Sequence, residues 1–419
     1  MKRILYLAPH SFPIHSSESI CNAKVAYILT QLGYNVDVIS IDDGASYPSA
    51  EKVDSVFLSE EKLSVFPVID KRHSNGIIAH IQSIIVHLTA YIKTGYYYKG
   101  VNYSYLTLKK AESLIHKYGV DSYVAMIARG YRTEVAALYL KKKYGLKWIA
   151  NWNDPYPIEK FPYPYGEGIN APLSRSMNII MNDIQKYADV HTFPSKRLRD
   201  YMLRYMTRVK VSNTSVIPHV AHSLLSFDEQ FNETDTLVLV HAGNVSHPRN
   251  PNNFLEAVSS FVHSASAPKL MCYFIGRVPN DFDKNLKDLD ITKNIKYISP
   301  KDYFSTLKYI RESHVSVIIE AICDEGIYLP TKVVDSIQCG RPIFCVSPAV
   351  GTLNDIINKN DIGYCADNTS IDSIASVLLS IYSDFKNNRL PQITKEKVSY
   401  FFEDSVGEQY IHLISGASD

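Results

Sequence analysis

The sequence lacks any marked excess of charge or of cysteine. Its 419 residues include 44 lysines and arginines against 43 aspartates and glutamates, a formal net charge of +1. A general nucleic-acid-binding protein presents a strongly basic surface, so this balance argues against nucleic acid as a partner. The cysteines form no Cys-x-x-Cys pair and have no histidine at zinc-site spacing. They are Cys21, Cys272, Cys323, Cys339, Cys345 and Cys365. We expect them to be reduced and mostly buried in a cytoplasmic protein.

Long apolar runs are also missing. The N-terminal MKRILYLAP has two basic residues followed by only four apolar ones, which indicates a first strand rather than a signal peptide. No window reaches the roughly 18–20 uninterrupted apolar residues of a spanning helix. The first turn, PHSFPIHSSES, lacks the G-x-G-x-x-G of dinucleotide oxidoreductases, and no P-loop pattern occurs. We expect no bound metal and no resident cofactor.

The remaining pattern alternates strand-like apolar runs with helical periods, which favours an α/β fold with parallel sheets. At 419 residues, two domains of roughly 200 residues are expected. A polar, acidic stretch at 223–235 separates them. We therefore place a first domain at 1–222 and a second at 236–395, followed by an amphipathic C-terminal helix within 396–419.

Residues 326–351 carry the most informative pattern of the chain. An apolar helical run, 332–338, ends at Cys339-Gly340, and a β-rich run, 342–346, leads into a small-residue turn that can open another helix. Such a turn leaves backbone N–H groups converging on one spot, which suits a diphosphate. The order P-x-K-x-x-(acid)-x-x-x-x-G-x-P-(strand)-x-x-x-x-G resembles the nucleotide-binding half of retaining GT-B glycosyltransferases. These form the glycogen-synthase-like, family 4-like superfamily.

This resemblance implies a GT-B fold, in which two Rossmann-like domains face each other across a cleft and the last helix crosses back to the first domain. The first domain would bind the acceptor and the second a nucleotide diphosphate sugar of unknown base. The implied reaction transfers a hexose-type sugar, with retention, to a glycan in cell-surface polysaccharide synthesis. Two alternatives stay open: a GT-B nucleotide-sugar epimerase, and a degenerate subunit that scaffolds an active glycosyltransferase.

The resemblance also assigns the acids of the donor site. Asp335 takes the position that binds the ribose hydroxyls, where the family usually has Glu; a solvated helix Asp is the alternative. The second family acid, eight residues earlier, falls on Ile327. Glu325, or Glu320 at the end of its strand, would replace it if the loop carries an insertion.

Cations and N–H donors would stabilise the negative charge that develops on the leaving diphosphate. By resemblance, Arg249 and Lys332 are the catalytic cations and Arg277 is a further candidate, with an ordinary surface cation as the alternative for each. Asn244 or His247 stands where the family has its Arg. The N–H groups of Val350, Gly351 and Thr352 would complete the phosphate-binding loop, and the nucleobase would lie near Ser299, Pro300 and Lys301.

The first domain offers fewer candidates. Ser17, in the loop 9–19, would supply hydroxyl and N–H donors to the donor phosphate, or belong to a helix cap. NWNDPYP at 151–157 resembles the RDPW loop of bacterial surface-polysaccharide glycosyltransferases. Its Asp154 would orient or deprotonate the acceptor. Three other side chains could line the same cleft: His10, His15 and Arg129.

Residues 77–98 read as an apolar helix with a tyrosine-rich end. Such a helix suits a bilayer interface, where it would bring the enzyme to a lipid-linked acceptor at the inner face of the cytoplasmic membrane. A buried core helix or a dimer contact are the alternatives.

Overall fold

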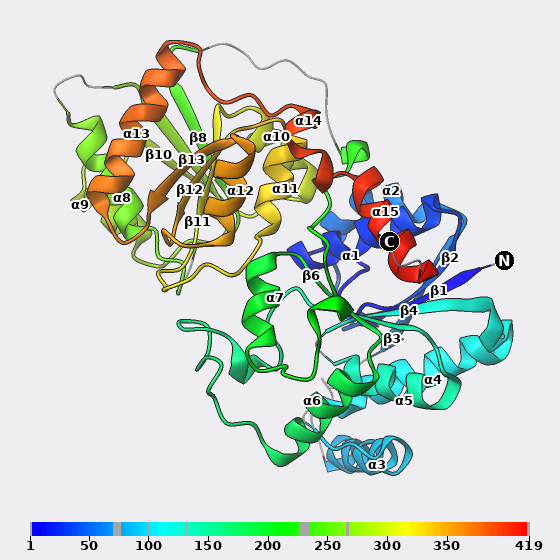
Figure 1. The fold of residues 1–419 in the computed structure, drawn as a ribbon. Helices are drawn as coiled ribbons and strands as arrows, with labels where there is room; N and C mark the ends of the chain where they lie inside the picture. The colour runs from blue at the N-terminus through cyan, green and yellow to red at the C-terminus, as the bar shows by residue number, and fades with distance from the viewer. Residues whose placement is uncertain are drawn as a thin grey trace. The chain divides into compact units, whose positions relative to one another are not determined.

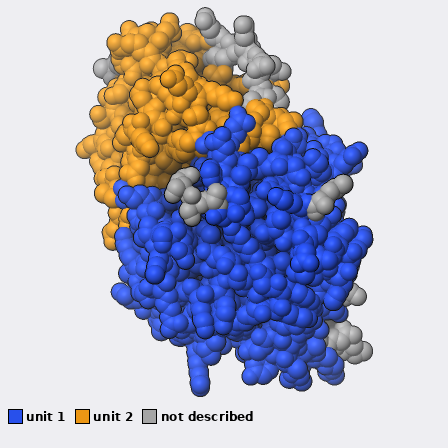
Figure 2. All heavy atoms as spheres, turned by 45° about the vertical axis from the view of Figure 1, so that its right-hand side comes forward, with its two compact units in different colours: residues 1–162, 166–218, 404–419 blue, residues 163–165, 219–403 orange. Residues whose placement is uncertain are grey.

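The computed structural model describes residues 2–69, 77–98, 100–130, 132–225, 234–245, 247–264 and 268–416. The chain forms two compact units, coloured separately in Figure 2. Unit 1 comprises residues 1–162, 166–218 and 404–419, and unit 2 comprises residues 163–165 and 219–403. Apart from residues 163–165, the chain leaves unit 1 after Pro218 and returns to it at Asp404.

Unit 1 is built on a seven-stranded parallel sheet with the strand order β3-β2-β1-β4-β5-β6-β7. Its strands are β1 (Arg3–Leu7), β2 (Asn35–Asp42), β3 (Leu63–Ile69), β4 (Tyr123–Arg129), β5 (Trp148–Asn151), β6 (Val190–Phe193) and β7 (Thr214–Val216). Its helices are α1 (Ser17–Gln31), α2 (Glu51–Leu58), α3 (Ile77–Thr94), α4 (Val101–Tyr118), α5 (Glu134–Tyr144), α6 (Arg175–Tyr187), α7 (Lys196–Leu203) and α15 (Glu403–Ser415).

Helices cover both faces of this sheet, with α1, α2 and α15 on one side and α4 and α5 on the other (Figure 1). The central strands are therefore near-continuous apolar runs: Ile4 to Leu7 in β1 are fully buried. The C-terminal α15 packs on α1 through Gly407, where an added side chain would lie 3.4 Å from both Ile28 and Leu32.

Unit 2 contains a six-stranded parallel sheet in the order β10-β9-β8-β11-β12-β13. Its strands are β8 (Leu237–Ala242), β9 (Leu270–Ile275), β10 (Ile295–Ile298), β11 (Val315–Ile319), β12 (Ile343–Ser347) and β13 (Gly363–Asp367). Its helices are α8 (Asn252–Val262), α9 (Phe282–Asp288), α10 (Tyr303–Arg311), α11 (Thr331–Gln338), α12 (Thr352–Asn360), α13 (Ile371–Lys386) and α14 (Lys395–Val398).

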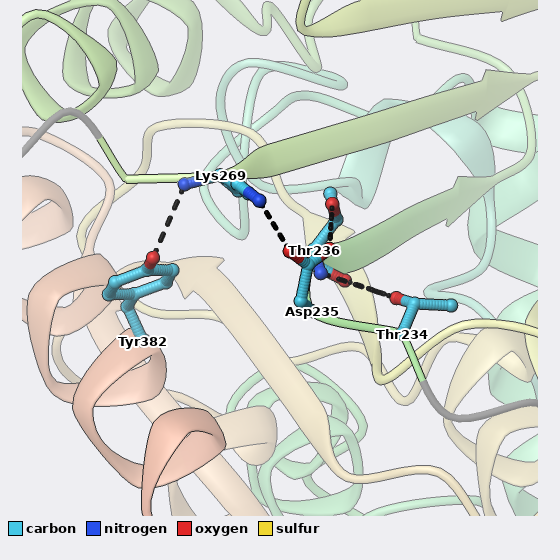
Figure 3. A network of polar contacts seen from close by, with 5 residues as sticks. All are labelled: Thr234, Asp235, Thr236, Lys269 and Tyr382. Carbon is cyan, nitrogen blue, oxygen red and sulfur yellow. Dashed lines mark hydrogen bonds and ion pairs between the residues drawn. The ribbon is translucent and has the colours of Figure 1, made fainter.

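The unit 2 sheet has an apolar core on each face. One core joins the strands to α8, α9 and α13, and the other joins them to α11 and α12. Figure 3 shows polar contacts around the segment that precedes β8. The Lys269 ammonium forms an ion pair with Asp235, and the Lys269 backbone N–H donates a hydrogen bond to the Tyr382 hydroxyl at 3.3 Å. These contacts connect the first strand of the unit to the second and to α13.

The two Rossmann-like parallel sheets confirm the fold class expected from the sequence. The helix expected over 77–98 is present as α3. It is not a buried core helix: of its described side chains only Ala90 is fully buried, and those of Ile77 to His80, Gln82 and Ser83 lie outside the description. None of the helices in the described part of the chain is both long and apolar enough to cross a bilayer.

Candidate functional site

Loops at the carboxyl edge of the unit 2 sheet bring the predicted donor-site residues together. The chain order reverses between the adjacent strands β8 and β11, which is the switch point where parallel sheets of this kind bind ligands. Gly243 and Asn244 directly follow β8, and Glu320 directly follows β11. Arg249 lies in the loop that follows Asn244, and Lys332 lies in the first turn of α11.

Arg249 and Glu320 form an ion pair at this switch point. The Arg249 Nε lies 3.4 Å from Oε1 of Glu320, whose side chain is largely buried, whereas the arginine is half-buried. The guanidinium also lies 5.6 Å from the centre of the Tyr165 ring, a residue that belongs to unit 2. Glu320, the alternative to Glu325 for the missing family acid, therefore has a cation beside it at a strand end.

Lys332 supplies a second cation to the same place. A Cβ on Gly243 would come within 2.5 Å of the Lys332 Cε and 2.9 Å of its Nζ, so the lysine can lie against position 243 only because that residue is a glycine. Burial lowers the pKa of Lys332 and Arg249 lowers it further, while Glu320 and Asp335 raise it. Burial, with help from both cations, also lowers the pKa of the buried His241 to about 3.

Asp335 lies on α11 and is bound by a residue that the sequence analysis missed. The Tyr303 hydroxyl on α10 donates to Asp335 Oδ1 at 2.6 Å, and Gln338 Nε2 donates to the same hydroxyl at 2.9 Å. Burial and the Asp335 charge raise the pKa of Tyr303 well above its usual value, so the hydroxyl remains a donor. The sequence offers one signal for this role of Tyr303: it is the first residue of the helix that follows the predicted base loop.

Hydrogen bonds join the turn before α12 to the loop that precedes α11. Gly326 and Gly351 form an isolated β-bridge, in which the Gly326 N–H donates to the Val350 carbonyl and the Thr352 N–H to the Gly326 carbonyl at 2.7 Å. The Thr352 hydroxyl donates to the Ile327 carbonyl. The N–H of Thr352 is thus used within the protein, and the predicted diphosphate loop has Val350 and Gly351 as its remaining N–H donors.

The other donor-site candidates occupy the same sheet edge. The Asn244 side chain accepts a hydrogen bond from the Arg277 N–H at 2.9 Å, which joins the loops that follow β8 and β9. Ser299 and Pro300 follow β10, and both are exposed. Glu325 is half-buried in the loop between β11 and α11. Ile327 is 1% exposed and belongs to the core rather than to a polar surface.

In unit 1, Asp154 lines a cavity of about 330 Å³ at the carboxyl ends of β4 and β5. His10 and Arg129 line it too, so three of the four side chains expected to share a site do so. The fourth, His15, is exposed and stacks on Tyr47 with ring centres 4.0 Å apart.

Ser17 is exposed in the first turn of α1. Its neighbours Ser16 and Ser19 form a reciprocal capping box, so helix capping accounts for those two hydroxyls.

Within the described residues, no group of three or more histidine, cysteine, aspartate or glutamate side chains is placed to hold a metal ion. Two Asp-x-Asp patterns are present, at 281/283 and 288/290, so the interpretation of the sequence as having no acid pair at this metal-ligand spacing is wrong. Their carboxylates are exposed along and after α9.

Comparison with known proteins identifies similar sequences and similar folds. Residues 225–397 match a family model described as glycosyl transferases group 1. A curated relative, the chitobiosyldiphosphodolichol beta-mannosyltransferase of Candida albicans, is 20% identical over 270 residues. That alignment covers 60% of this chain and only 57% of the relative.

Two solved structures share the fold over the whole length of both chains. Sucrose-phosphate synthase from Thermosynechococcus elongatus superposes with a TM-score of 0.68 at 12% identity. HepE from Anabaena, in complex with UDP and glucose, superposes with a TM-score of 0.66 at 11% identity. The chain thus has the GT-B fold, and its segment 225–397, which contains the Arg249, Lys332 and Asp335 site, matches the group 1 glycosyltransferases.

Proposed function

We propose that this protein is a glycosyltransferase that moves a sugar from a nucleotide diphosphate sugar to a glycan acceptor. The observation that carries the proposal is the placement of Arg249 and Lys332 with Glu320 at the switch point of unit 2. Two cations at such a point suit a diphosphate. The family match over the same segment and the relatives' names support this chemistry.

In the proposed reaction the bond between the sugar C1 and the diphosphate oxygen breaks, and the diphosphate leaves with additional negative charge. Arg249 and Lys332 stabilise that charge, which is where fixed cations contribute most. The acceptor hydroxyl forms the new bond to C1 on the same face, with retention, and its proton passes to the Asp154 carboxylate as the bond forms. We assign orientation of the acceptor hydroxyl to Asp154.

The rest of the donor would be held by the neighbouring loops. Asp335, oriented by Tyr303, accepts hydrogen bonds from the ribose hydroxyls, and the N–H groups of Val350 and Gly351 contact the phosphates. Ser299 and Pro300 contact the base, and Arg277 adds positive charge beside Asn244. Glu320, rather than Glu325, replaces the missing family acid, because it already lies beside Arg249.

We further propose that the acceptor is a lipid-linked surface glycan and that α3 brings the enzyme to the membrane face. Side chains at helical spacing on α3 are between half and three-quarters exposed, although all are apolar or aromatic: Ile81, Ile84, Ile85, Leu88, Tyr91 and Ile92. Figure 1 shows α3 on the outside of unit 1. An exposed apolar stripe of this kind suits insertion at a bilayer interface.

The experiment is to incubate the purified protein with UDP-glucose, UDP-galactose, GDP-mannose or ADP-glucose, with and without a glycolipid extract. We expect release of nucleoside diphosphate from one donor only when the extract is present. Arg249→Ala should lower the rate by about 100-fold or more. Lys308→Ala, which removes an exposed cation of α10, is the matched control.

Two outcomes would contradict this proposal. Conversion of the donor sugar without any acceptor would establish an epimerase. Nucleotide binding without turnover under any condition would establish a scaffold subunit.

A further inference from the structure

Arg129 is a buried cation with one guanidinium nitrogen that has no hydrogen-bond partner among the described residues. It is the last residue of β4 and is 3% exposed. Its Nη2 has no hydrogen-bond partner, and it forms no ion pair with any residue in the described ranges. Since a buried charge is costly unless it is paired or hydrogen-bonded, an arginine in this position indicates a missing partner.

The guanidinium borders a cavity rather than close-packed core. Arg129 lines the cavity of about 330 Å³ in unit 1, a volume within the usual range for small-molecule sites. The order in which the chain adds strands to the unit 1 sheet reverses between β1 and β4, so the cavity lies at the switch point of this sheet. In the sheet register Arg129 is the partner of Asn151, whose Oδ1 is also buried without a hydrogen bond.

Two other titratable groups, Glu18 and His10, line the cavity beside this cation. Glu18 lines the same cavity, and burial raises the pKa of its carboxyl although Arg129 opposes the shift. Burial lowers the pKa of His10, and the nearby charges of Arg132 and His15 lower it further, which favours its neutral form. The buried Tyr6 hydroxyl lies beside Arg129. Asp154 is exposed at the rim.

We propose that this cavity binds an oxyanion, a phosphate or a carboxylate, carried by the acceptor. A planar guanidinium binds such groups through two parallel hydrogen bonds, and it does so most strongly where water is excluded. Trp152, Tyr156 and Phe161 form an apolar wall of the cavity against which a sugar ring fits. The binding of an anion stands on the cavity alone, whereas its assignment to the acceptor rests on the proposed function.

Tryptophan fluorescence provides a direct test. The chain has two tryptophans, Trp148 and Trp152, and only Trp152 lines the cavity. In a Trp148→Phe chain, we would titrate inorganic phosphate, glucose 1-phosphate, glucuronate and glucose. The phosphate and carboxylate probes distinguish the two kinds of oxyanion. We expect a saturable change with at least one anionic probe and none with glucose at the same concentrations.

Two variants test the role of the guanidinium. Arg129→Gln should weaken binding of the anion about tenfold or more, and Arg129→Lys, which keeps the charge and loses the planar fork, should weaken it less. If Arg129→Gln does not fold, the comparison of glucose with glucose 1-phosphate in the parent chain still decides. Equal binding of the two sugars, or unchanged anion binding by a folded Arg129→Gln chain, would overturn the proposal.

Nucleoside diphosphate binding, measured calorimetrically on the same chains, separates this inference from the proposed function. We expect Arg129→Gln to keep nucleotide affinity and Arg249→Ala to lose it. Anion binding at Trp152 without any nucleotide binding would overturn the glycosyltransferase and leave the anion site in place. A nucleotide that changes Trp152 fluorescence and needs Arg129 would assign the oxyanion to the donor and overturn the acceptor assignment.

Discussion

The Tyr303 hydroxyl donates a hydrogen bond to Oδ1 of Asp335 at 2.6 Å and so joins the start of α10 to the middle of α11. Gln338 Nε2 donates a hydrogen bond to the same hydroxyl oxygen. The hydroxyl proton of Tyr303 therefore points towards Asp335. A carboxylate held in this way is fixed in place before a ligand arrives, which reduces the entropy lost on binding. The base loop at Ser299 and Pro300 immediately precedes α10, so this bond also ties that loop to the ribose-binding candidate.

Tyr303→Phe removes this bond and leaves the ring. We expect the free energy of unfolding to fall by about 1–3 kcal/mol, the usual cost of losing a buried hydrogen bond to a charged group. Nucleotide affinity should fall as well, because Asp335 is no longer held. Urea denaturation and calorimetry measure the two effects. Tyr309→Phe removes a hydroxyl from the same helix without touching Asp335, and equal losses in both variants would contradict the assigned role.

Glu320→Gln separates stability from anion binding. The substitution leaves Arg249 and Lys332 without their shared acid, so we expect unfolding to become easier by about 1–3 kcal/mol. The same loss of negative charge should tighten the binding of a nucleoside diphosphate. Glu312→Gln, on the exposed ion pair with Lys308, is the control. A variant that loses both stability and nucleotide affinity would show that Glu320 does not oppose the phosphate.

Acid should destabilise the protein through His241. Burial lowers its pKa from 6.5 to about 3, so the folded state keeps this imidazole neutral while the unfolded chain binds a proton below pH 6.5. Stability therefore falls as the pH drops from 6.5 towards 3, by about 2 kcal/mol at pH 5 from this group alone.

His241→Gln should flatten the dependence of the unfolding free energy on pH by that amount between pH 7.5 and pH 5. Burial also lowers the pKa values of His191 and His314 to about 4, so part of the dependence should persist. His412→Gln, at an exposed position on α15, is the matched substitution control. Parallel curves for the parent and His241→Gln chains would exclude a neutral buried imidazole.

The apolar stripe of α3 should bind lipid vesicles. Ile84→Ser with Leu88→Ser removes two side chains that are 54% and 57% exposed. Since burial of each contributes about 1.5–3 kcal/mol, co-sedimentation with anionic vesicles should fall tenfold or more. Leu379→Ser, on α13 at 52% exposure, should leave it unchanged. Self-association that the double variant abolishes, without any vesicle binding, would show that the stripe meets a second copy instead.

The sequence predicts the sheets well where strands are buried on both faces. RILYL, LVLVHA and VSVII each contain one polar residue and are otherwise apolar, and each forms a central strand. The edge strands β3 and β13 were not predicted, since one contains Pro67 and the other starts at a glycine. At Gly363 an added side chain would lie 1.9 Å from the Ile343 carbonyl oxygen, a close approach that no apolar period reveals.

The candidate donor site also contains residues that the sequence predicts and residues that only the fold brings in. Arg249, Lys332 and Asp335 were selected by resemblance and by position after strands. Their partners Glu320, Gly243 and Tyr303 depend on which strand ends meet, and that follows from sheet order rather than from local pattern. That Nη2 of Arg129 has no hydrogen-bond partner among the described residues is likewise a property of three-dimensional packing.

The most direct test of the account is calorimetric titration of the intact chain with UDP, GDP and ADP. The account predicts saturable binding of one of them, weakened about tenfold or more by Arg249→Ala and by Asp335→Ala and unchanged by Lys308→Ala. Absence of binding for all three nucleotides, or binding that survives both site variants, would contradict a donor site at the carboxyl edge of the unit 2 sheet.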